Sequence, residues 1–191
     1  MRLWTIQPLE VYNLIQEQDY YTCDINKSDL AQFESFIIAY NWLNERMKDK
    51  IGNPPDNIQY PVWAWHTRNW KQKKPDLREA GHGTRGTKMV CLEIEIPDDE
   101  VVLSDFDAWH FVLNNWYIGD ALTSEESDEE DIWLENHSEE EQKRIIRESW
   151  EKIFDITPIQ SDWLSRGQYV QATFWKLSKE NIKKVQFFKA R

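Results

Sequence analysis

The chain has 191 residues, of which 40 % are apolar and 30 % are charged, as in a folded domain with one hydrophobic core. Its formal net charge of −11 argues against nonspecific coating of nucleic acid, and no apolar run reaches the ~18 residues of a membrane-spanning helix. The opening residues lack a secretory-signal pattern and Cys23 and Cys91 lie far apart, so we expect a cytoplasmic protein with reduced thiols.

The first fifty residues predict short strands alternating with helices. Residues 2–7 predict a strand, Pro8 suits the first turn of the helix that follows, and residues 20–23 predict a second strand. Ser28 can cap a longer helix that Gly52 ends.

Aromatic side chains mark the next strand. Residues 60–67, YPVWAWHT, alternate so that Trp63 and Trp65 share one face. A basic, glycine-containing loop follows from 68 to 87, and it carries enough Lys and Arg to hold a few phosphates. Residues 88–96 then alternate as another strand.

Acidic residues concentrate in the second half of the chain. SEESDEED at 124–131 belongs to a predicted acidic loop, and we expect a solvated surface insert around 120–140. Ser138 and Glu141 then have the S-x-x-E spacing of a capping box, which predicts a helix behind them.

The remaining strands complete the fold prediction. Residues 101–105 predict a short strand, 169–176 alternate cleanly, and 184–189 close the chain as a last strand. About seven short strands and three or four helices, without regular βαβ alternation, favour an α+β fold for a single domain over residues 1–191.

Standard catalytic motifs are absent from the sequence. It has no glycine-rich phosphate loop followed by Lys-Ser/Thr, no H-E-x-x-H, no CxxC pair and no G-x-S-x-G. His66, His82, His110 and His137 lack metal-ligand spacing, so we predict no metal site and interpret them as surface or hydrogen-bonded residues.

The eleven tryptophans are the unusual feature of the composition. Tryptophan faces build cores, but they also stack on nucleobases, at about 1–3 kcal/mol per base. Trp63 and Trp65, with Arg68 three residues on, could hold a base or nicotinamide ring and its phosphate. The competing interpretation is that both rings cover a helix.

Two further clusters could form the walls of a cleft. Asp105, Asp107 and His110 lie among aromatics in SDFDAWHFVLNNWY, either as helix caps or as the polar wall of a site. Alternation along 169–176 places four side chains on one face, which suggests a groove wall: Tyr169, Gln171, Thr173 and Trp175.

Three segments carry a family resemblance over nearly the whole chain. WTIQ near the start, LSDFDAWH in the middle and YVQATFWKL near the end resemble a family of bacterial proteins grouped as a domain of unknown function. That family name implies no activity.

The order of parts also resembles, more distantly, the ADP-ribosyltransferases of the DNA-targeting toxin type. LWTIQ followed by VYNLIQEQDYY is similar to their first strand and helix, MVCLEIEIP to a middle strand, and QATFWKLSKENIKKVQFF to their closing strands. This resemblance implies split sheets with flanking helices and NAD bound in an aromatic cleft, with a nucleobase or a protein as the target.

The same resemblance suggests site residues. It implies NAD contacts from Trp4, Thr5 and Gln7 on the first strand and from Trp63, Trp65 and Arg68 in the middle, and the two wall clusters add Asp105, His110 and Trp175. Thr173, two residues after Gln171, stands where the family has its catalytic glutamate. That departure should remove most transfer activity unless Glu93, Glu95 or Glu180 supplies a carboxylate.

Three functional hypotheses follow from the sequence. The first is an ADP-ribosyltransferase-like protein that binds NAD or a related nucleotide, with or without transfer chemistry. The second is a non-enzymatic module that stacks a nucleotide or single-stranded nucleic acid on its tryptophans. The third is an interaction protein whose tryptophans form its core.

Overall fold

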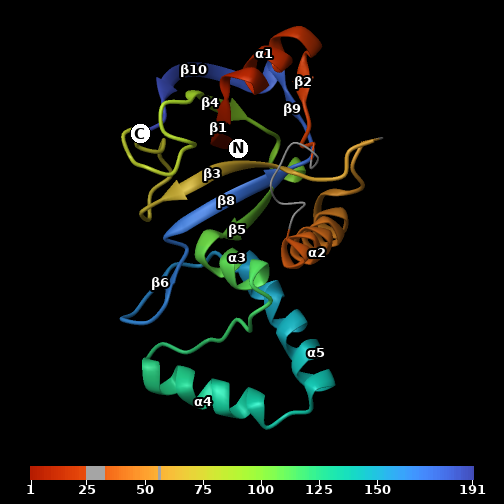
Figure 1. The fold of residues 1–191 in the computed structure, drawn as a ribbon, viewed down its shortest axis with the longest axis vertical. Coiled ribbons are helices and arrows are strands. Elements are labelled where there is room, and N and C mark those ends of the chain that lie inside the picture. The colour runs from red at the N-terminus through yellow and green to blue at the C-terminus, as the bar shows by residue number, and fades with distance from the viewer. Residues whose placement is uncertain (25–32, 56) are drawn as a thin grey trace.

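A six-stranded antiparallel sheet organises the computed structural model, which describes residues 1–24, 33–55 and 57–191. The strands lie in the order β10-β4-β1-β3-β8-β5 (Figure 1). Their bounds are β1 Arg2–Pro8, β3 Val62–Arg68, β4 Lys88–Glu95, β5 Val102–Asp105, β8 Tyr169–Phe174 and β10 Ile182–Lys189. The α+β prediction is confirmed, and the four strands expected around 60–67, 88–96, 169–176 and 184–189 all belong to this sheet.

One face of the sheet carries the first core. The register pairs Leu3 with Ile94 and Val62 with Phe174, so these apolar side chains line the same face as the alternation requires. Helix α1 (Leu9–Gln18) covers this face with Ile15, which is fully buried.

The opposite face carries a second, more aromatic core. Helices α2 (Glu34–Ile51) and α3 (Phe106–Leu113) pack there with the 3-10 helix η4 (Trp150–Phe154), as their core residues Trp42, Trp109 and Trp150 show. Figure 1 shows α2 and α3 beside the part of the sheet formed by β3, β8 and β5. These helices do not cover the strands on the other side of β3, which are β1, β4 and β10.

Side-chain caps mark the starts of two helices in the second half of the chain. Ser138 and Glu141 form the predicted capping box of α5 (Glu139–Ser149). Residues expected in an acidic loop instead form α4 (Ser124–Glu135), capped by the Thr123 side chain. Acids in the first turn suit the positive end of the helix dipole, which explains why an acidic run becomes helical. Ser28, the predicted cap of the α2 region, lies outside the described residues.

Short elements complete the chain. Two-stranded ribbons pair β2 (Tyr20–Tyr21) with β9 (Leu177–Ser178) and β6 (Ile159–Gln160) with β7 (Ser165–Arg166). The 3-10 helices η3 (Asp98–Glu100) and η5 (Lys179–Asn181) precede β5 and β10. The resemblance to ADP-ribosyltransferases implies split sheets, whereas the main strands here share one six-stranded sheet, and these two ribbons are separate from it. None of the described helices has the length and apolar character needed to cross a bilayer.

Candidate functional site

A row of side chains crosses the aromatic face of the sheet, one from each strand. Register pairs join each member to the next, so all of them point to the same side. From β10 to β5 the row reads Lys184, Glu93, Trp4, Trp65, Gln171 and Ser104. Trp65, near the middle of this row, marks the edge of a cavity.

That cavity, which we call the Trp65 cleft, has a volume of about 440 Å³. Strands β1, β3 and β8 form its floor, the start of α3 forms one wall, and the loop between β3 and β4 forms the other. Its lining residues are Ile6, Trp65, Arg68, Ala80, Gly81, His82, Phe106, Asp107 and Tyr169. The cleft therefore combines three aromatic rings with a guanidinium, an imidazole and a carboxylate.

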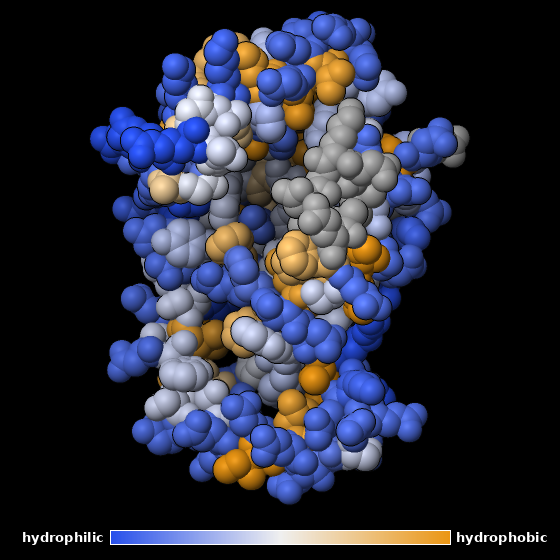
Figure 2. Space-filling view, viewed as in Figure 1, coloured by the Kyte–Doolittle hydropathy of each residue, from blue (hydrophilic) through white to orange (hydrophobic). Residues whose placement is uncertain are grey.

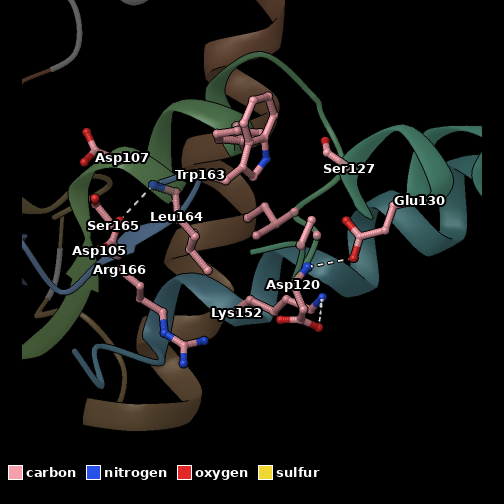
Figure 3. A pocket seen from close by; sticks show the side chains of 15 residues that line it. Asp105, Asp107, Asp120, Ser127, Glu130, Lys152, Trp163, Leu164, Ser165 and Arg166 are labelled. Atoms are coloured by element: carbon pink, nitrogen blue, oxygen red, sulfur yellow. Dashed lines mark hydrogen bonds and ion pairs between the residues drawn. The ribbon is translucent and has the colours of Figure 1, made fainter. Parts of the chain in front are cut away.

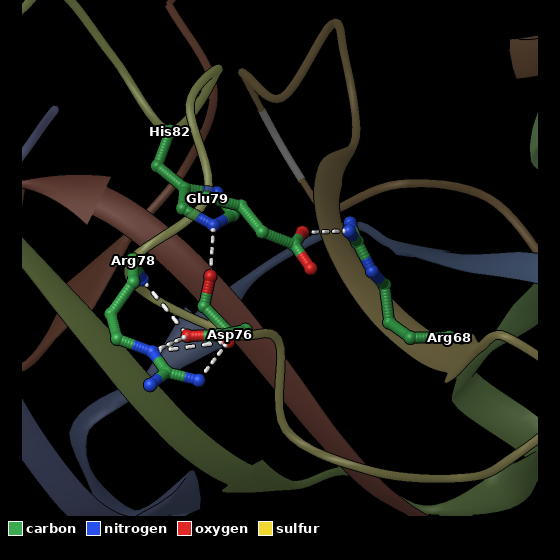
Figure 4. Close-up of polar contacts among 5 residues, drawn as sticks. All are labelled: Arg68, Asp76, Arg78, Glu79 and His82. Atoms are coloured by element: carbon green, nitrogen blue, oxygen red, sulfur yellow. Dashed lines mark hydrogen bonds and ion pairs between the residues drawn. The ribbon is translucent and has the colours of Figure 1, made fainter.

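Arg68 is the cationic centre of the cleft. Its guanidinium carbon lies 4.5 Å from the ring centroid of Trp65 and 5.4 Å from that of Tyr169. These cation–π contacts hold the guanidinium in place while its side chain stays 17 % exposed. Its Nη2 also donates to Glu79 Oε2 at 2.5 Å, across the cleft from the loop (Figure 4).

The loop that carries Glu79 is folded by its own polar contacts. The Arg78 guanidinium donates to both carboxylate oxygens of Asp76 and holds the pKa of that carboxyl well below its usual range. The backbone oxygen of Asp76 accepts a hydrogen bond from His82 Nε2 at 2.9 Å (Figure 4). Lys74 Nζ donates to Gln186 on β10, which ties the loop to the sheet. The loop therefore presents Glu79 and His82 from a defined position.

The α3 wall supplies an aromatic ring and a carboxyl group. Phe106 packs against Trp65 with ring centroids 5.1 Å apart. Partial desolvation, together with the negative charge of Asp105, raises the pKa of Asp107, and His110 opposes that change. A carboxyl with a raised pKa beside an aromatic wall is a suitable hydrogen-bonding group for a polar ligand.

Only some of the predicted residues lie in the cleft. Trp65 and Arg68 line it, and Gln171 is the register partner of Trp65 on β8 but does not line the cavity. Trp63 packs between Tyr40 of α2 and Trp109 of α3, as the core interpretation predicted for that ring. Trp175 is also core, and its Nε1 donates to the backbone oxygen of Gly52.

The β1 residues expected to contact NAD do not line the cleft and instead make contacts within the protein. Trp4 and Thr5 are buried, and Thr5 Oγ1 donates to the Trp63 backbone oxygen at 2.8 Å. Gln7 Nε2 donates to that same hydroxyl. Ile6, which sequence reasoning did not select, is the β1 side chain that lines the cleft, and the alternation that turns Trp4 to this face could have identified it.

Asp105 and His110 have structural partners. Asp105 caps α3 by accepting from Ala108 N, and its other oxygen accepts from Gly167 N at 2.6 Å. His110 is exposed, with Nδ1 2.9 Å from the Phe106 backbone oxygen. The capping alternative for this cluster therefore describes Asp105, whereas its neighbours Phe106 and Asp107 reach the cleft.

The three residues predicted for catalysis differ in access. Thr173 is fully buried and donates to the Val102 backbone oxygen, so its side chain has no surface open to a ligand in this structure. Glu93 is half-buried, lies beyond Trp4 in the same row and forms an ion pair with Lys184 at 4.0 Å. Among the described residues, no group of three or more His, Cys, Asp or Glu side chains could hold a metal ion.

Comparison with known proteins identifies a family. A family model described as a domain of unknown function, DUF3841, matches residues 2–183. No curated protein and no solved structure matches the chain. The matched range includes the three segments WTIQ, SDFDAWH and YVQATFW, so the family resemblance seen in the sequence is confirmed. The chain belongs to this family, DUF3841.

Proposed function

We propose that this protein binds NAD or a related nucleotide in the Trp65 cleft. The observation that carries the proposal is the position of Arg68, held between the Trp65 and Tyr169 rings in a cavity large enough for a base. Aromatic rings stack on bases, and a guanidinium recognises phosphate with two parallel hydrogen bonds.

The residues have separate roles in this proposal. A base or nicotinamide ring stacks beside Trp65 and Phe106, and Asp107 accepts or donates a hydrogen bond at its polar edge. A phosphate takes the place of Glu79 on Arg68. Because one anion replaces another, the guanidinium keeps an ionic partner throughout and its desolvation cost changes little.

Transfer chemistry on NAD depends on a carboxylate near the ribose. Thr173 cannot supply the charge, and Glu93 is the half-buried carboxylate on the row that leads to Trp65. We therefore expect weak or no release of nicotinamide by the isolated protein, measured by chromatography. Release at an ordinary enzymatic rate would assign the chemistry to another acid, with Glu93→Gln as the first variant to test.

Binding itself is tested by thermal shift and calorimetry with NAD, ADP-ribose, ADP and adenosine. A ligand at 100 times its dissociation constant should stabilise the protein by about 2.7 kcal/mol. Arg68→Gln should weaken the binding of ADP and ADP-ribose at least tenfold and leave the affinity for adenosine nearly unchanged, because only the phosphate contact is lost. Arg144→Gln is the matched control, since Arg144 is an exposed, ion-paired arginine of α5 that does not line the cleft.

A second variant tests the stacking surface. Trp65→Ala should reduce the binding free energy of every ligand that carries a base by about 1–3 kcal/mol. Trp133→Ala removes an exposed tryptophan of α4 and should have no effect. If none of the four ligands binds the wild-type protein at millimolar concentration, the proposed function is wrong.

A cytoplasmic location is part of the same proposal. Cys23 and Cys91 are both free thiols, which suits a reducing compartment where NAD and nucleotides are abundant. Neither thiol contributes to the Trp65 cleft.

A further inference from the structure

A second cavity, of about 450 Å³, lies beside the Trp65 cleft, and Asp107 at the start of α3 lines both cavities. We call it the α4 groove; it is bounded by α3, residues 118–121, α4 and the β6–β7 hairpin. Figure 3 shows Trp163 and Leu164 of the hairpin facing Ser127 and Glu130 of α4 across it. Its apolar lining is Ala108, Phe111, Ile118, Ala121, Trp163 and Leu164.

The walls of the groove are held by polar contacts, so it is preformed. Glu130 accepts from the backbone N–H of Asp120, and its carboxylate occupies the space where Gly119 would carry a Cβ. The hairpin is fixed on the other side by the Arg166–Asp155 ion pair at 2.8 Å. A preformed groove loses little conformational entropy when a ligand fills it.

Large apolar side chains around the groove remain exposed to solvent. Trp163 is 55 % exposed on its rim and Phe111 is 42 % exposed in its lining, while Ile132 on α4 is 61 % exposed. In Figure 2, orange patches interrupt the hydrophilic surface at the lower end, where Figure 1 shows α4. Exposed apolar side chains that gather at a preformed cavity, as Trp163 and Phe111 do here, are typical of interaction sites.

The charge around the groove is strongly negative. Both cations that line it already have partners, Lys152 with Asp120 at 2.7 Å and Arg166 with Asp155. Helix α4, with the sequence SEESDEEDIWLE, contains no Lys or Arg, and its acids form no ion pair within the part of the chain that the structure describes. A bound partner therefore meets apolar side chains flanked by carboxylates that have no cationic partner there.

We propose that the α4 groove binds a peptide segment of a partner protein, in which a large apolar side chain is flanked by lysines or arginines. The apolar side chain would fill the cavity beside Trp163, and the basic residues would face α4. The negative charge of α4 favours this occupant over the others. Its acids repel nucleic acid and anionic membranes, and a second copy of the chain is also repelled because its own net charge is −11.

The experiment uses a display library of random dodecapeptides panned on the full chain. Enriched peptides should combine Lys or Arg with Trp, Phe or Leu, and they are then synthesised with a fluorescent label for anisotropy titration. Trp163→Ala should weaken the binding of these peptides at least tenfold, because a central aromatic contact dominates such interfaces. Phe187→Ala, which removes an exposed aromatic from β10, is the matched control.

Charge is tested separately on the same peptides. Replacing Asp128, Glu129 and Asp131 of α4 by their amides should weaken binding several-fold at low salt and flatten its salt dependence. The matched control neutralises Glu10, Glu17 and Glu34, three exposed acids of α1 and α2. Unchanged melting temperatures verify that each variant is folded.

Three results would overturn the proposal. They are the absence of enrichment, enrichment of acidic peptides, and equal binding of the selected peptides to Trp163→Ala. A wild-type dimer in sedimentation that Trp163→Ala dissociates would assign the groove to a second copy instead. None of these outcomes depends on nucleotide binding in the Trp65 cleft.

Discussion

At the scale of single residues, Asp105 connects two distant parts of the chain. One carboxylate oxygen caps α3 through Ala108 N, and the other accepts from Gly167 N, 62 residues further on. The carboxylate is almost completely buried, so both donors rely on it. Its side chain thereby fixes the start of α3, on which Phe106 and Asp107 reach the Trp65 cleft.

Asp105→Ala should destabilise the protein by about 2–4 kcal/mol. The change removes a helix cap, at about 1 kcal/mol, and leaves the buried Gly167 N–H without an acceptor, at about 1–3 kcal/mol. Urea unfolding followed by circular dichroism measures the effect. Asp107→Ala, two residues away and exposed, should change stability by less than about 0.5 kcal/mol, and equal effects of the two variants would contradict the assigned role.

The buried thiol of Cys91 should make the free energy of unfolding decrease at alkaline pH. Burial and the nearby Glu93 charge raise the pKa of its thiol from 9.0 to about 11, while Lys74 opposes this. Above pH 9 the unfolded chain loses a proton that the folded chain keeps, so stability falls between pH 9 and 11, by at most about 2–3 kcal/mol. Urea unfolding at pH 8, 9.5 and 10.5 should show a shallower loss for Cys91→Ala than for wild type. Parallel losses in the two proteins would rule the thiol out as the cause.

At the scale of elements, α4 differs from the other helices. It buries none of its residues, and side-chain contacts rather than core packing attach it to the body. Its Glu126 and Glu130 side chains accept hydrogen bonds from the backbone N–H groups of Leu122 and Asp120 in the preceding segment. Its attachment is therefore local, and the sheet does not depend on it.

Glu130→Ala should loosen α4 without unfolding the protein. Loss of the Asp120 N–H acceptor should speed amide hydrogen exchange across 124–135, while the midpoint of global unfolding moves by less than about 1 kcal/mol. Gly119→Ala should act similarly, since its new Cβ would displace the Glu130 carboxylate. Glu129→Ala, on the same helix but at a side chain that makes no hydrogen bond to a described residue, should leave the exchange of these amides unchanged.

At the scale of the whole molecule, negative charge is the dominant property. A net charge of −11 and a sequence pI near 4.9 produce self-repulsion in the folded state at neutral pH. The exposed ion pairs that oppose it contribute little individually.

Added salt should therefore raise the melting temperature at pH 7. Increasing NaCl from about 0.02 to 0.5 M shortens the Debye length from about 20 to 4 Å and screens the repulsion. The rise should disappear near the sequence pI of about 4.9, where the net charge vanishes. A fall in melting temperature with salt at pH 7 would mean that ion pairs outweigh the net repulsion.

The strands and several helix starts could be predicted because they depend on neighbouring residues. Alternation along 60–67, 88–96 and 169–176 identified strands that the structure contains, and the Ser138–Glu141 spacing identified the start of α5. The α4 helix was missed because its acidic composition resembles that of a solvated loop, and its Thr123 cap was not recognised.

The position of each tryptophan was decided only by the tertiary structure. Trp63 and Trp65 share one strand and one face, so alternation treats them alike, yet α2 and α3 cover Trp63 whereas Trp65 opens into a cleft. Period-two alternation determined by the sequence specifies which face a side chain occupies. What packs on that face depends on elements far away in the chain, and here these are α2, α3 and the loop that carries Glu79.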